Sequence, residues 1–243
     1  MTTRGAEASA ETVVLAINGG SSSLKFALFG IDDASERRLV EGAVERIGGD
    51  HGRAWIREGT ARTERAATCA THLEALDLAF ELLATKGRER FQVAAHRIVH
   101  GGPDHVQPVI VDAAVMASLR RVVALAPLHM PASIAGIEAV AARRPALPQV
   151  ACFDTAFHAT LPELARRLPL PERFKDVRRY GFHGLSYEYV MSTLGPNAPS
   201  RVVIAHLGNG ASLVAVKDGR AIDTTMGLTP TGGILMGTRS GDA

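Results

Sequence analysis

Two arginines, several histidines and six loops of small residues are the groups in this 243-residue chain that could do chemistry. Arg97 lies between two histidines in AHRIVHGG (95–102), and Arg239 lies among small residues in GTRSGD (237–242). A guanidinium group binds carboxylates and phosphates through paired hydrogen bonds, and glycine-rich loops offer backbone N–H groups to the same anions. The sequence has no metal-ligand spacing and no nucleophile triad. The combination therefore favours phosphoryl transfer, although Arg97 alone could equally belong to a structural ion pair.

The loop NGGSSSLK (18–25) has the composition of a phosphate cradle. It supplies bare backbone, three hydroxyl groups and the ammonium group of Lys25. It is not a GxxxxGK[ST] loop, because Leu24 stands where that motif needs glycine. A plain Gly/Ser turn is the alternative interpretation.

Three further stretches set polar groups among apolar or glycine neighbours: APLHMP (126–131), CFDTAFH (152–158) and YGFHGLSYEY (180–189). A lone histidine is more often a core or surface residue with a satisfied ring than a member of a site. Asp154 could simply cap a helix. His183 directly precedes an expected helix, where backbone N–H groups attract anions. HLGNGAS (206–212) is another glycine-rich loop.

The elements that must position these groups follow from hydrophobic periodicity and turn signals. Strands are expected at 13–17, 24–29, 38–44, 54–57, 91–99, 149–153 and 201–206. Helices are expected at 71–84 with Thr71 and Glu74 as a capping box, after Asp112, from Pro131 to near Pro145, and at 186–194. A hairpin turn is expected at 217–220. Strands mixed with helices at this spacing predict an α/β fold.

Three polar candidates fall at or near the ends of expected strands: Asn18, Arg97 and Asp154. In open α/β sheets, ligands gather at the carboxyl ends of strands. VVLAINGGSSSLKFAL (13–28) also matches VVIAHLGNGASLVAVK (202–217) at six positions. This echo indicates either two related half-structures or the general likeness of any strand–glycine turn–strand unit.

The bulk composition excludes several classes of protein. The formal net charge is only +2 and no long Lys/Arg run exists, so nucleic-acid binding is not expected. The start lacks the apolar region of a signal peptide, and the apolar run 13–17 is too short to span a bilayer. Cys69 and Cys152 form no CxxC motif and are expected to be reduced thiols. We therefore expect a cytoplasmic protein with a flexible tail over residues 1–12.

Eight stretches, taken together, resemble the acetate kinase family. In family order they are NGGSSSLKF, HRIVHGG, APLHMP, FDTAFH, YGFHGLS, HLGNGAS, IDTTMGLTP and MGTRSGD. The resemblance implies the two-domain fold of sugar kinases, actin and heat-shock chaperone ATPases, in which each domain is an RNase H-like α/β unit. It places the first domain at 13–150 and the beginning of the second at 151–243. Family members continue beyond the last motif, so we expect the second domain to be incomplete.

The implied reaction is ATP + acetate ⇌ ADP + acetyl phosphate, with Mg²⁺ or Mn²⁺. Carried over by motif, Asn18 is expected near the metal ion, and Lys25, Ser21 and Ser23 near the ATP phosphates. The resemblance likewise assigns ATP phosphates to His206, Leu207, Gly208, Asn209 and Gly210.

Arg97 and Arg239 are expected to bind the acetate carboxylate and the migrating phosphoryl group. Asp154 carries the family's acid/base label, but a carboxylate nucleophile needs no deprotonation near neutral pH, so we expect it to position other groups. His183 is expected to stabilise charge on the transferring group, with His129 nearby. The family's apolar pocket for the acetate methyl group corresponds to Val99, Leu128, Phe182 and Pro230.

The sequence departs from the family motifs at two places, and two alternative functions remain open. Met130 stands where the family usually has asparagine, and TPTGG (229–233) is looser than the family's usual TPLEG. A hydrophobic pocket discriminates by only ~1–3 kcal/mol per methylene, so a kinase for propionate or butyrate is one alternative. A non-catalytic remnant that binds phosphate or acyl ligands is the other. The family is typically homodimeric, and the resemblance leaves dimerisation of this chain open.

Overall fold

The computed structural model describes residues 11–33, 35–175 and 177–242, which form two compact units. Unit 1 combines Met1–His96 with Ala135–Val150, and unit 2 combines Arg97–Ile134 with Ala151–Ala243. The border at 150/151 coincides with the expected domain border, whereas residues 97–134 group with unit 2. The compact units are defined by contacts within this chain, whereas the expected domains come from the fold of a family. The expected domain division therefore stays a prediction. Of the expected tail, residues 1–10 lie outside the described residues, and the first strand begins at Thr12.

Unit 1 is built on an antiparallel meander. Its strands are β1 (Thr12–Gly20), β2 (Ser23–Ile31), β3 (Glu36–Glu45), β4 (Arg53–Glu58) and β5 (Ala61–Ala66). Strand β6 (Val93–Ile98) pairs in parallel with β1, from Val14↔Val93 to Ile17↔His96. The hydrogen-bonded order of the large sheet is β5-β4-β3-β2-β1-β6-β8-β7, where β7 is Val109–Ile110 and β8 is Gln149–Phe153.

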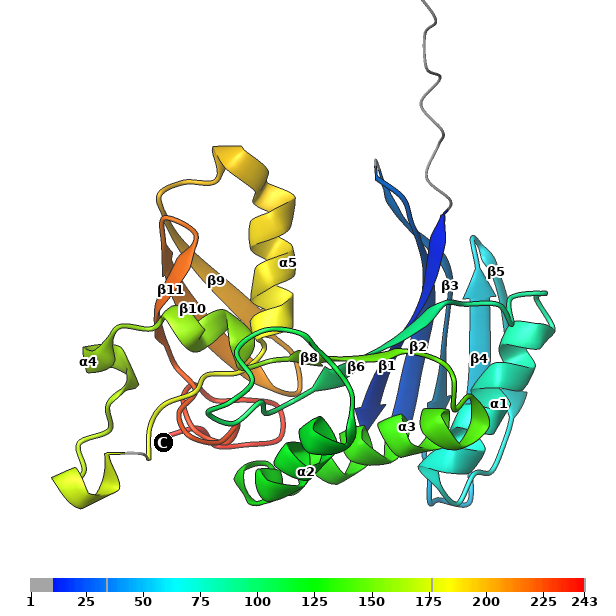
Figure 1. Ribbon diagram of the computed structural model, residues 1–243, viewed down its shortest axis with the longest axis horizontal. Coiled ribbons are helices and arrows are strands. Elements are labelled where there is room, and N and C mark those ends of the chain that lie inside the picture. Colours follow the sequence, from blue (N-terminus) through cyan, green and yellow to red (C-terminus); the bar gives the residue numbers. More distant parts are fainter. Residues whose placement is uncertain (1–10, 34, 176, 243) are drawn as a thin grey trace, which may run out of the picture. The chain divides into compact units, whose positions relative to one another are not determined.

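Helix α1 (His72–Ala84) packs against β2, β3 and β4 (Figure 1). Its start follows the predicted capping box: the Glu74 N–H donates to Thr71 Oγ1 at 3.2 Å, and the Glu74 carboxylate accepts from the Ala70 N–H at 2.8 Å. Alternating apolar residues of the strands and the inner face of α1 share one buried cluster. The hydrophobic face thus fixes the register of the strands, because a slip of one residue would turn every core side chain outward.

Helices α2 (Ala113–Arg121) and α3 (Met130–Arg143) follow. The Asp112 carboxylate caps α2 by accepting from the Val115 N–H at 2.8 Å, as predicted. The chain then forms α4 (Glu163–Arg166) and α5 (Gly184–Leu194). Short 3₁₀ turns lie at Val123–Leu125, Ala156–Thr160, Glu172–Phe174 and Gly195–Asn197.

A three-stranded antiparallel sheet completes unit 2, in the order β11-β10-β9. Its strands are β9 (Arg201–Leu207), β10 (Ala211–Lys217) and β11 (Arg220–Thr224), and α5 lies beside it (Figure 1). Asp218 and Gly219 both have positive φ, at 49° and 77°, which is the twist that a two-residue hairpin needs. The hairpin predicted at 217–220 is therefore confirmed.

The sequence echo corresponds to two hairpins, β1–β2 and β9–β10. The first turns at Ser21–Ser22 and the second at Gly208–Gly210. Strand β5 was not predicted. Its sequence ARTERA has no apolar alternation and every residue is exposed, as suits an edge strand that resists pairing with other chains.

No helix among the described residues is long and apolar enough to cross a membrane. Cys69 and Cys152 are both free, as predicted, and burial raises the pKa of each thiol.

Candidate active site

Arg97 and Asp154 form the central ion pair of unit 2. Arg97 is the next-to-last residue of β6, and Asp154 directly follows β8. Arg97 Nη2 lies 2.5 Å from Asp154 Oδ2, and Arg97 Nε lies 3.1 Å from Oδ1. The Asp154 side chain is only 2% exposed, whereas that of Arg97 is 34% exposed. Burial lowers the pKa of Arg97, but the Asp154 carboxylate outweighs it and the net pKa is raised. The buried carboxylate thus orients a guanidinium group that solvent can reach.

The backbone around Asp154 explains one glycine of the YGFHGLS motif, Gly184. The Asp154 N–H donates to Ile98 O at 2.9 Å, and the Gly184 N–H donates to Asp154 O at 2.8 Å. A Cβ at Gly184 would come within 2.2 Å of Asp154 O. Only glycine therefore allows α5 to begin this close to the main-chain carbonyl of Asp154.

His183 precedes α5 in a left-handed conformation, with φ 60°. Its Nδ1 atom lies 2.8 Å from Ser212 Oγ, and its ring stacks on His206 with centroids 4.1 Å apart. His206 Nδ1 in turn lies 3.0 Å from Ser186 Oγ. Burial, helped by His206 and Arg97, lowers the pKa of His183 to about 3. The His183 ring is therefore neutral at physiological pH.

Arg239 and His183 converge above Gly210. A Cβ at Gly210 would lie 2.5 Å from Arg239 Nη2 and 3.2 Å from His183 Nε2. The Arg239 guanidinium also donates through Nη1 to Pro230 O. Burial lowers the pKa of Arg239, yet a guanidinium remains charged near neutrality. Gly210 thus leaves room for one cationic donor and one neutral ring nitrogen to share a site.

His129 and His206 lie within the electrostatic reach of this cluster. Burial lowers the pKa of His129, and the charges of Arg239 and Arg97 lower it further. Burial and then Arg97 also lower the pKa of His206, while Asp154 opposes the shift. Unit 2 therefore brings together six predicted site residues: Arg97, His129, Asp154, His183, His206 and Arg239.

The four residues expected to line an apolar pocket differ in their burial. Val99, Phe182 and Pro230 are buried, whereas Leu128 is 73% exposed. His100, whose ring centroid lies 5.4 Å from that of Phe182, fills space beside the pocket residues. Burial lowers the pKa of His100 to about 4. The assignment of these four residues to an acyl pocket stays a prediction.

The predicted phosphate cradle is the β1–β2 hairpin of unit 1. Asn18 and Lys25 are opposite each other in the ladder, so their side chains lie on the same face of the hairpin. Gly20 pairs with Ser23, and Ser21 and the following serine form the exposed turn. Two contacts hold this turn: His72 Nε2 lies 2.7 Å from Gly20 O, and the Ile47 N–H donates to Ser22 O at 2.9 Å.

The described residues contain no group of three His, Cys, Asp or Glu side chains that could hold a metal ion. The side-chain oxygen atoms around the β1–β2 turn are one amide oxygen, from Asn18, and serine hydroxyl groups. Mg²⁺ accepts such oxygen ligands and usually keeps several waters alongside substrate phosphates. The donor set fits a magnesium ion bound largely through a nucleotide.

Sequence reasoning missed several residues that shape the site. Tyr187 and Ser212 are fully buried beside His183, and His158 Nε2 lies 3.0 Å from Phe182 O. A Cβ at Gly181 would clash with the His158 ring at 2.6 Å, so His158 packs the YGFHG turn. Ser212 had one available signal, since it matches Ser23 in the sequence echo.

Comparison with known proteins decides the family. The acetokinase family model matches residues 13–243. The chain belongs to the acetokinase family.

Curated relatives in this family are named acetate kinase. The chain is 45% identical to the protein of Dichelobacter nodosus over 94% of its own length and 59% of the relative. It is 46% identical to the proteins of Deinococcus deserti and Streptomyces avermitilis, over 95% of its length and 59% and 60% of theirs. The chain thus spans about three-fifths of the length of the curated relatives it matches.

Solved structures of the family share the fold. A propionate kinase from Francisella tularensis is 36% identical with a TM-score of 0.88, and the chain covers 62% of it. Porphyromonas gingivalis acetate kinase is 34% identical with a TM-score of 0.83, with 61% covered. In each comparison 96% of this chain is aligned. The α/β fold predicted from the acetokinase motifs, of the RNase H-like actin and sugar-kinase type, is confirmed.

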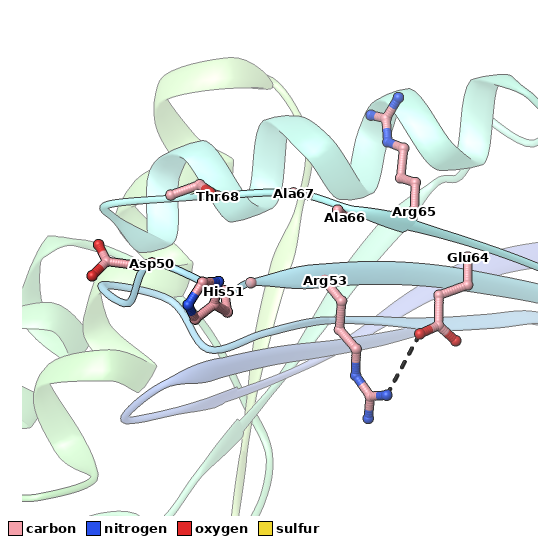
Figure 2. A pocket seen from close by; sticks show the side chains of 9 residues that line it. Asp50, His51, Arg53, Glu64, Arg65, Ala66, Ala67 and Thr68 are labelled. Atoms are coloured by element: carbon pink, nitrogen blue, oxygen red, sulfur yellow. Dashed lines mark hydrogen bonds and ion pairs between the residues drawn. The ribbon is translucent and has the colours of Figure 1, made fainter.

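A hollow of about 550 Å³ in unit 1 lies outside every acetokinase motif found in the sequence. It is lined by residues 50–53 and 64–68 (Figure 2). Arg53 Nη1 lies 3.5 Å from Glu64 Oε1 across it, and Arg65 pairs with Glu81 at 2.8 Å.

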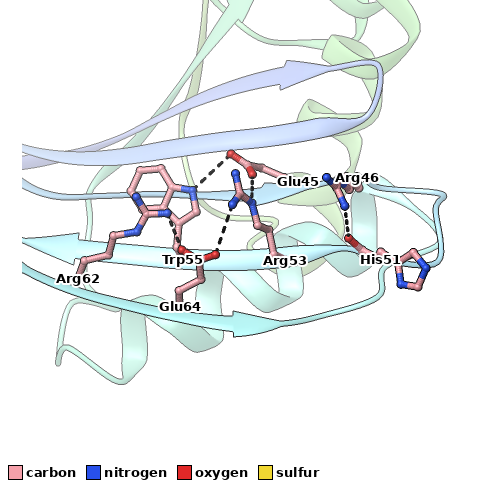
Figure 3. Close-up of polar contacts among 7 residues, drawn as sticks. All are labelled: Glu45, Arg46, His51, Arg53, Trp55, Arg62 and Glu64. Carbon is pink, nitrogen blue, oxygen red and sulfur yellow. Dashed lines mark hydrogen bonds and ion pairs between the residues drawn. The ribbon is translucent and has the colours of Figure 1, made fainter.

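Most of the polar contacts beside this hollow form one network, while the Arg46 guanidinium separately donates to His51 O at 3.3 Å (Figure 3). Arg53 also binds Glu45, while Arg62 lies 4.5 Å above the Trp55 ring and 2.6 Å from Glu64. Both arginines of the hollow, Arg53 and Arg65, already have carboxylate partners within the chain. These carboxylate contacts therefore account for both charges, and those of Arg53 join the edge strand β5 to β4 and β3.

Proposed function

We propose that this chain carries the machinery for transferring the γ-phosphoryl group of ATP to the carboxylate of acetate. One acetate oxygen attacks the γ-phosphorus atom, the bond from that phosphorus to the β–γ bridging oxygen breaks, and ADP leaves. The products are acetyl phosphate and ADP, and the reaction is reversible. The single observation that carries the proposal is the convergence of Arg239 and His183 above Gly210, in a unit that also holds the Arg97–Asp154 pair.

Phosphoryl transfer requires donors where negative charge gathers on the transferring oxygens. In the proposal, the Arg239 guanidinium supplies a charged donor and the neutral His183 ring supplies a second one. His129 lies near enough for the charges of Arg239 and Arg97 to lower its pKa. We assign it a supporting contact to the same group.

Arg97 binds the acetate carboxylate in this proposal, and Asp154 orients Arg97. A carboxylate nucleophile is ionised at neutral pH, so no base has to remove a proton from it. Val99, Leu128, Phe182 and Pro230 form the proposed contact surface for the methyl group.

The two glycine-rich hairpin turns bind nucleotide phosphates in the proposal. In unit 2 this is the segment from His206 to Gly210, and in unit 1 it is Ser21, Ser23 and Lys25. Asn18 contributes its amide oxygen toward Mg²⁺ or Mn²⁺. When bound, the metal ion neutralises charge on the phosphate oxygens.

A kinase for propionate is the second candidate, because a propionate kinase is among the solved structures that share this fold. One extra methylene changes binding by only ~1–3 kcal/mol, so the shape of the site favours neither acid decisively.

Hydroxamate trapping of the acyl phosphate tests both candidates. The purified chain is supplied with ATP, Mg²⁺ and either acetate, propionate or butyrate, and kcat/KM is compared among the acids. The proposal predicts acetyl hydroxamate with the highest kcat/KM. A higher value for propionate moves the second candidate forward. Trapping no acyl phosphate from any acid would reject both and favour a chain that only binds phosphate or acyl ligands.

A further inference from the structure

Three buried side chains of unit 2 form a row behind the candidate site. His183 Nδ1 lies 2.8 Å from Ser212 Oγ, and the Tyr187 hydroxyl is hydrogen-bonded to the same Ser212 oxygen. His183 is 9% exposed, and both Ser212 and Tyr187 are fully buried. Among the described residues, the Tyr187 hydroxyl has no hydrogen-bond partner other than Ser212 Oγ. Each hydroxyl proton in the row must therefore find its acceptor within the row.

The number of protons available in the row determines which atom donates in each hydrogen bond. The row has two contacts, and each contact uses one proton. If His183 Nδ1 is bare, Tyr187 donates to Ser212, Ser212 donates to Nδ1, and both hydroxyl protons are used. If Nδ1 carries a proton, three donors compete for two contacts, and one buried O–H has no acceptor. A buried polar group without a partner carries its full desolvation penalty.

We propose that Ser212 is a positioning residue that holds His183 in the tautomer with its proton on Nε2, and that Tyr187 aims the Ser212 hydroxyl. Tyr187 does so by donating to one lone pair of Ser212, which turns the Ser212 proton toward Nδ1. A hydrogen bond received by one hydroxyl also strengthens the hydrogen bond that it gives. The same row disfavours the imidazolium form, because that form also places a proton on Nδ1.

The fixed proton points toward the candidate site. Nε2 lies 3.2 Å from the position that a Cβ at Gly210 would occupy, and Arg239 Nη2 lies 2.5 Å from that position. An Nε2–H group would add a neutral donor beside the cation, whereas a bare Nε2 would turn a lone pair toward any bound anion. The use of this proton rests on the proposed function. The tautomer itself does not, because it follows from buried contacts alone.

Nitrogen-15 NMR of the histidine rings of this chain reads the tautomer directly. Two-bond proton–nitrogen correlations distinguish Nε2–H from Nδ1–H, and the His183 signals are identified by their loss in His183→Gln. We expect only the Nε2–H form in the wild-type chain. In Ser212→Ala we expect the Nδ1–H form to become detectable.

The control is Ser186→Ala, since Ser186 makes the equivalent contact to Nδ1 of His206. This variant should leave the His183 tautomer unchanged. Because Ser212→Ala also leaves the Tyr187 hydroxyl without a partner, Ser212→Ala/Tyr187→Phe removes both polar groups together and guards against misfolding. It should shift the tautomer in the same direction. Finding His183 as Nδ1–H in the wild type, or unchanged in the double variant, would overturn the inference.

Acyl phosphate synthesis, measured on the same samples, separates this inference from the proposed function. A tautomer that shifts as expected in a chain that makes no acyl phosphate would reject the proposed function and retain the inference. A rate that falls in Ser212→Ala through kcat, with KM for ATP unchanged, would support both.

Discussion

At the scale of the residue, Asp154 and Arg97 form one ion pair that can be interpreted in two ways. The sequence left a structural and a functional interpretation of Arg97 open, and the geometry is compatible with both. The carboxylate is buried and makes a forked contact, while a third of the arginine side chain reaches solvent. The position of the pair follows from two strand ends, which is why the sequence could indicate it.

Asp154→Asn should lower the free energy of unfolding by about 1–3 kcal/mol, because it removes the charge that compensates Arg97. This range allows for the solvent that screens the exposed part of Arg97. Urea unfolding measures the change. Asp77→Asn is the matched control, since Asp77 makes a similar forked contact to Arg143 but on the surface, with both N–O distances 2.6 Å. Equal losses of stability in the two variants would contradict a buried environment for the Asp154–Arg97 pair.

The predicted residue roles differ in how far the sequence could support them. Motif order predicted a shared site for Arg97, Asp154, His183 and Arg239, and all four lie in unit 2. The partners of His183 could not be found in this way. Tyr187 lies one helical turn after His183, but Ser212 comes from strand β10, and only the folded chain shows that the three residues meet.

At the scale of the element, the loop between β9 and β10 depends on glycine for a reason of space. A Cβ at Gly210 would collide with Arg239 Nη2, whereas the nearest atom to a Cβ at Gly208 lies 3.5 Å away, at ordinary contact distance. The two glycines of one loop therefore have different constraints.

Gly210→Ala should reduce kcat of acyl phosphate synthesis by about 10- to 100-fold, because displacing a catalytic donor by about 1 Å has effects of this size. Steady-state kinetics at saturating ATP and acetate measure kcat, and thermal unfolding checks that the fold is intact. Gly227→Ala, where an added Cβ would meet no atom within 4 Å, should stay close to the wild-type rate. Equal losses in the two variants would argue against a role for the contact above Gly210.

The start of α1 offers a second test at this scale. Thr71→Ala should cost about 1 kcal/mol of stability, since it leaves the Glu74 N–H without its cap. Thr71→Ser keeps the hydroxyl group and should recover most of the loss in urea unfolding. An alanine variant as stable as the serine variant would contradict the cap.

Elements with strong local signals were predicted well. The capping box, the Asp112 cap, the 217–220 hairpin and the buried strand 149–153 all have the expected residues in the expected places. Strand β5 was missed because cross-strand charge pairs such as Arg53–Glu64 hold it, and these depend on the register rather than on hydrophobic alternation.

At the scale of the whole molecule, buried histidines link stability to pH. Burial is the largest cause that lowers the pKa of His96, His100 and His158 to about 4 and that of His183 to about 3. In the unfolded chain a histidine has a pKa near 6.5. The unfolded state therefore binds more protons than the native state between pH 6.5 and about 4.

The free energy of unfolding should consequently fall by several kcal/mol as the pH drops from about 6.5 to about 4. The lowered pKa values of Glu45 and Asp77 act in the same direction at the acid end. Urea unfolding at half-unit steps of pH measures the slope. A free energy that stays level or rises over this range would show that these rings are not neutral in the folded chain.

Fold and family were predictable at this scale because eight ordered motifs constrain the backbone along the whole chain. The grouping of residues 97–134 with unit 2 was not predictable, because its borders fall inside β6 at one end and inside α3 at the other. The domain borders expected from the sequence divide the chain at one point, whereas the compact units are defined by which residues pack together.

The central claim is that Arg239 acts on the phosphoryl group during transfer to a carboxylate, and the most direct test is the rate of acetyl phosphate synthesis by Arg239→Ala. Removing an arginine that stabilises the transition state should lower kcat by about 10³-fold with little loss of stability. Arg220→Ala, which removes an exposed arginine from β11, is the control and should keep the wild-type rate. An Arg239→Ala chain as active as the control would contradict the account.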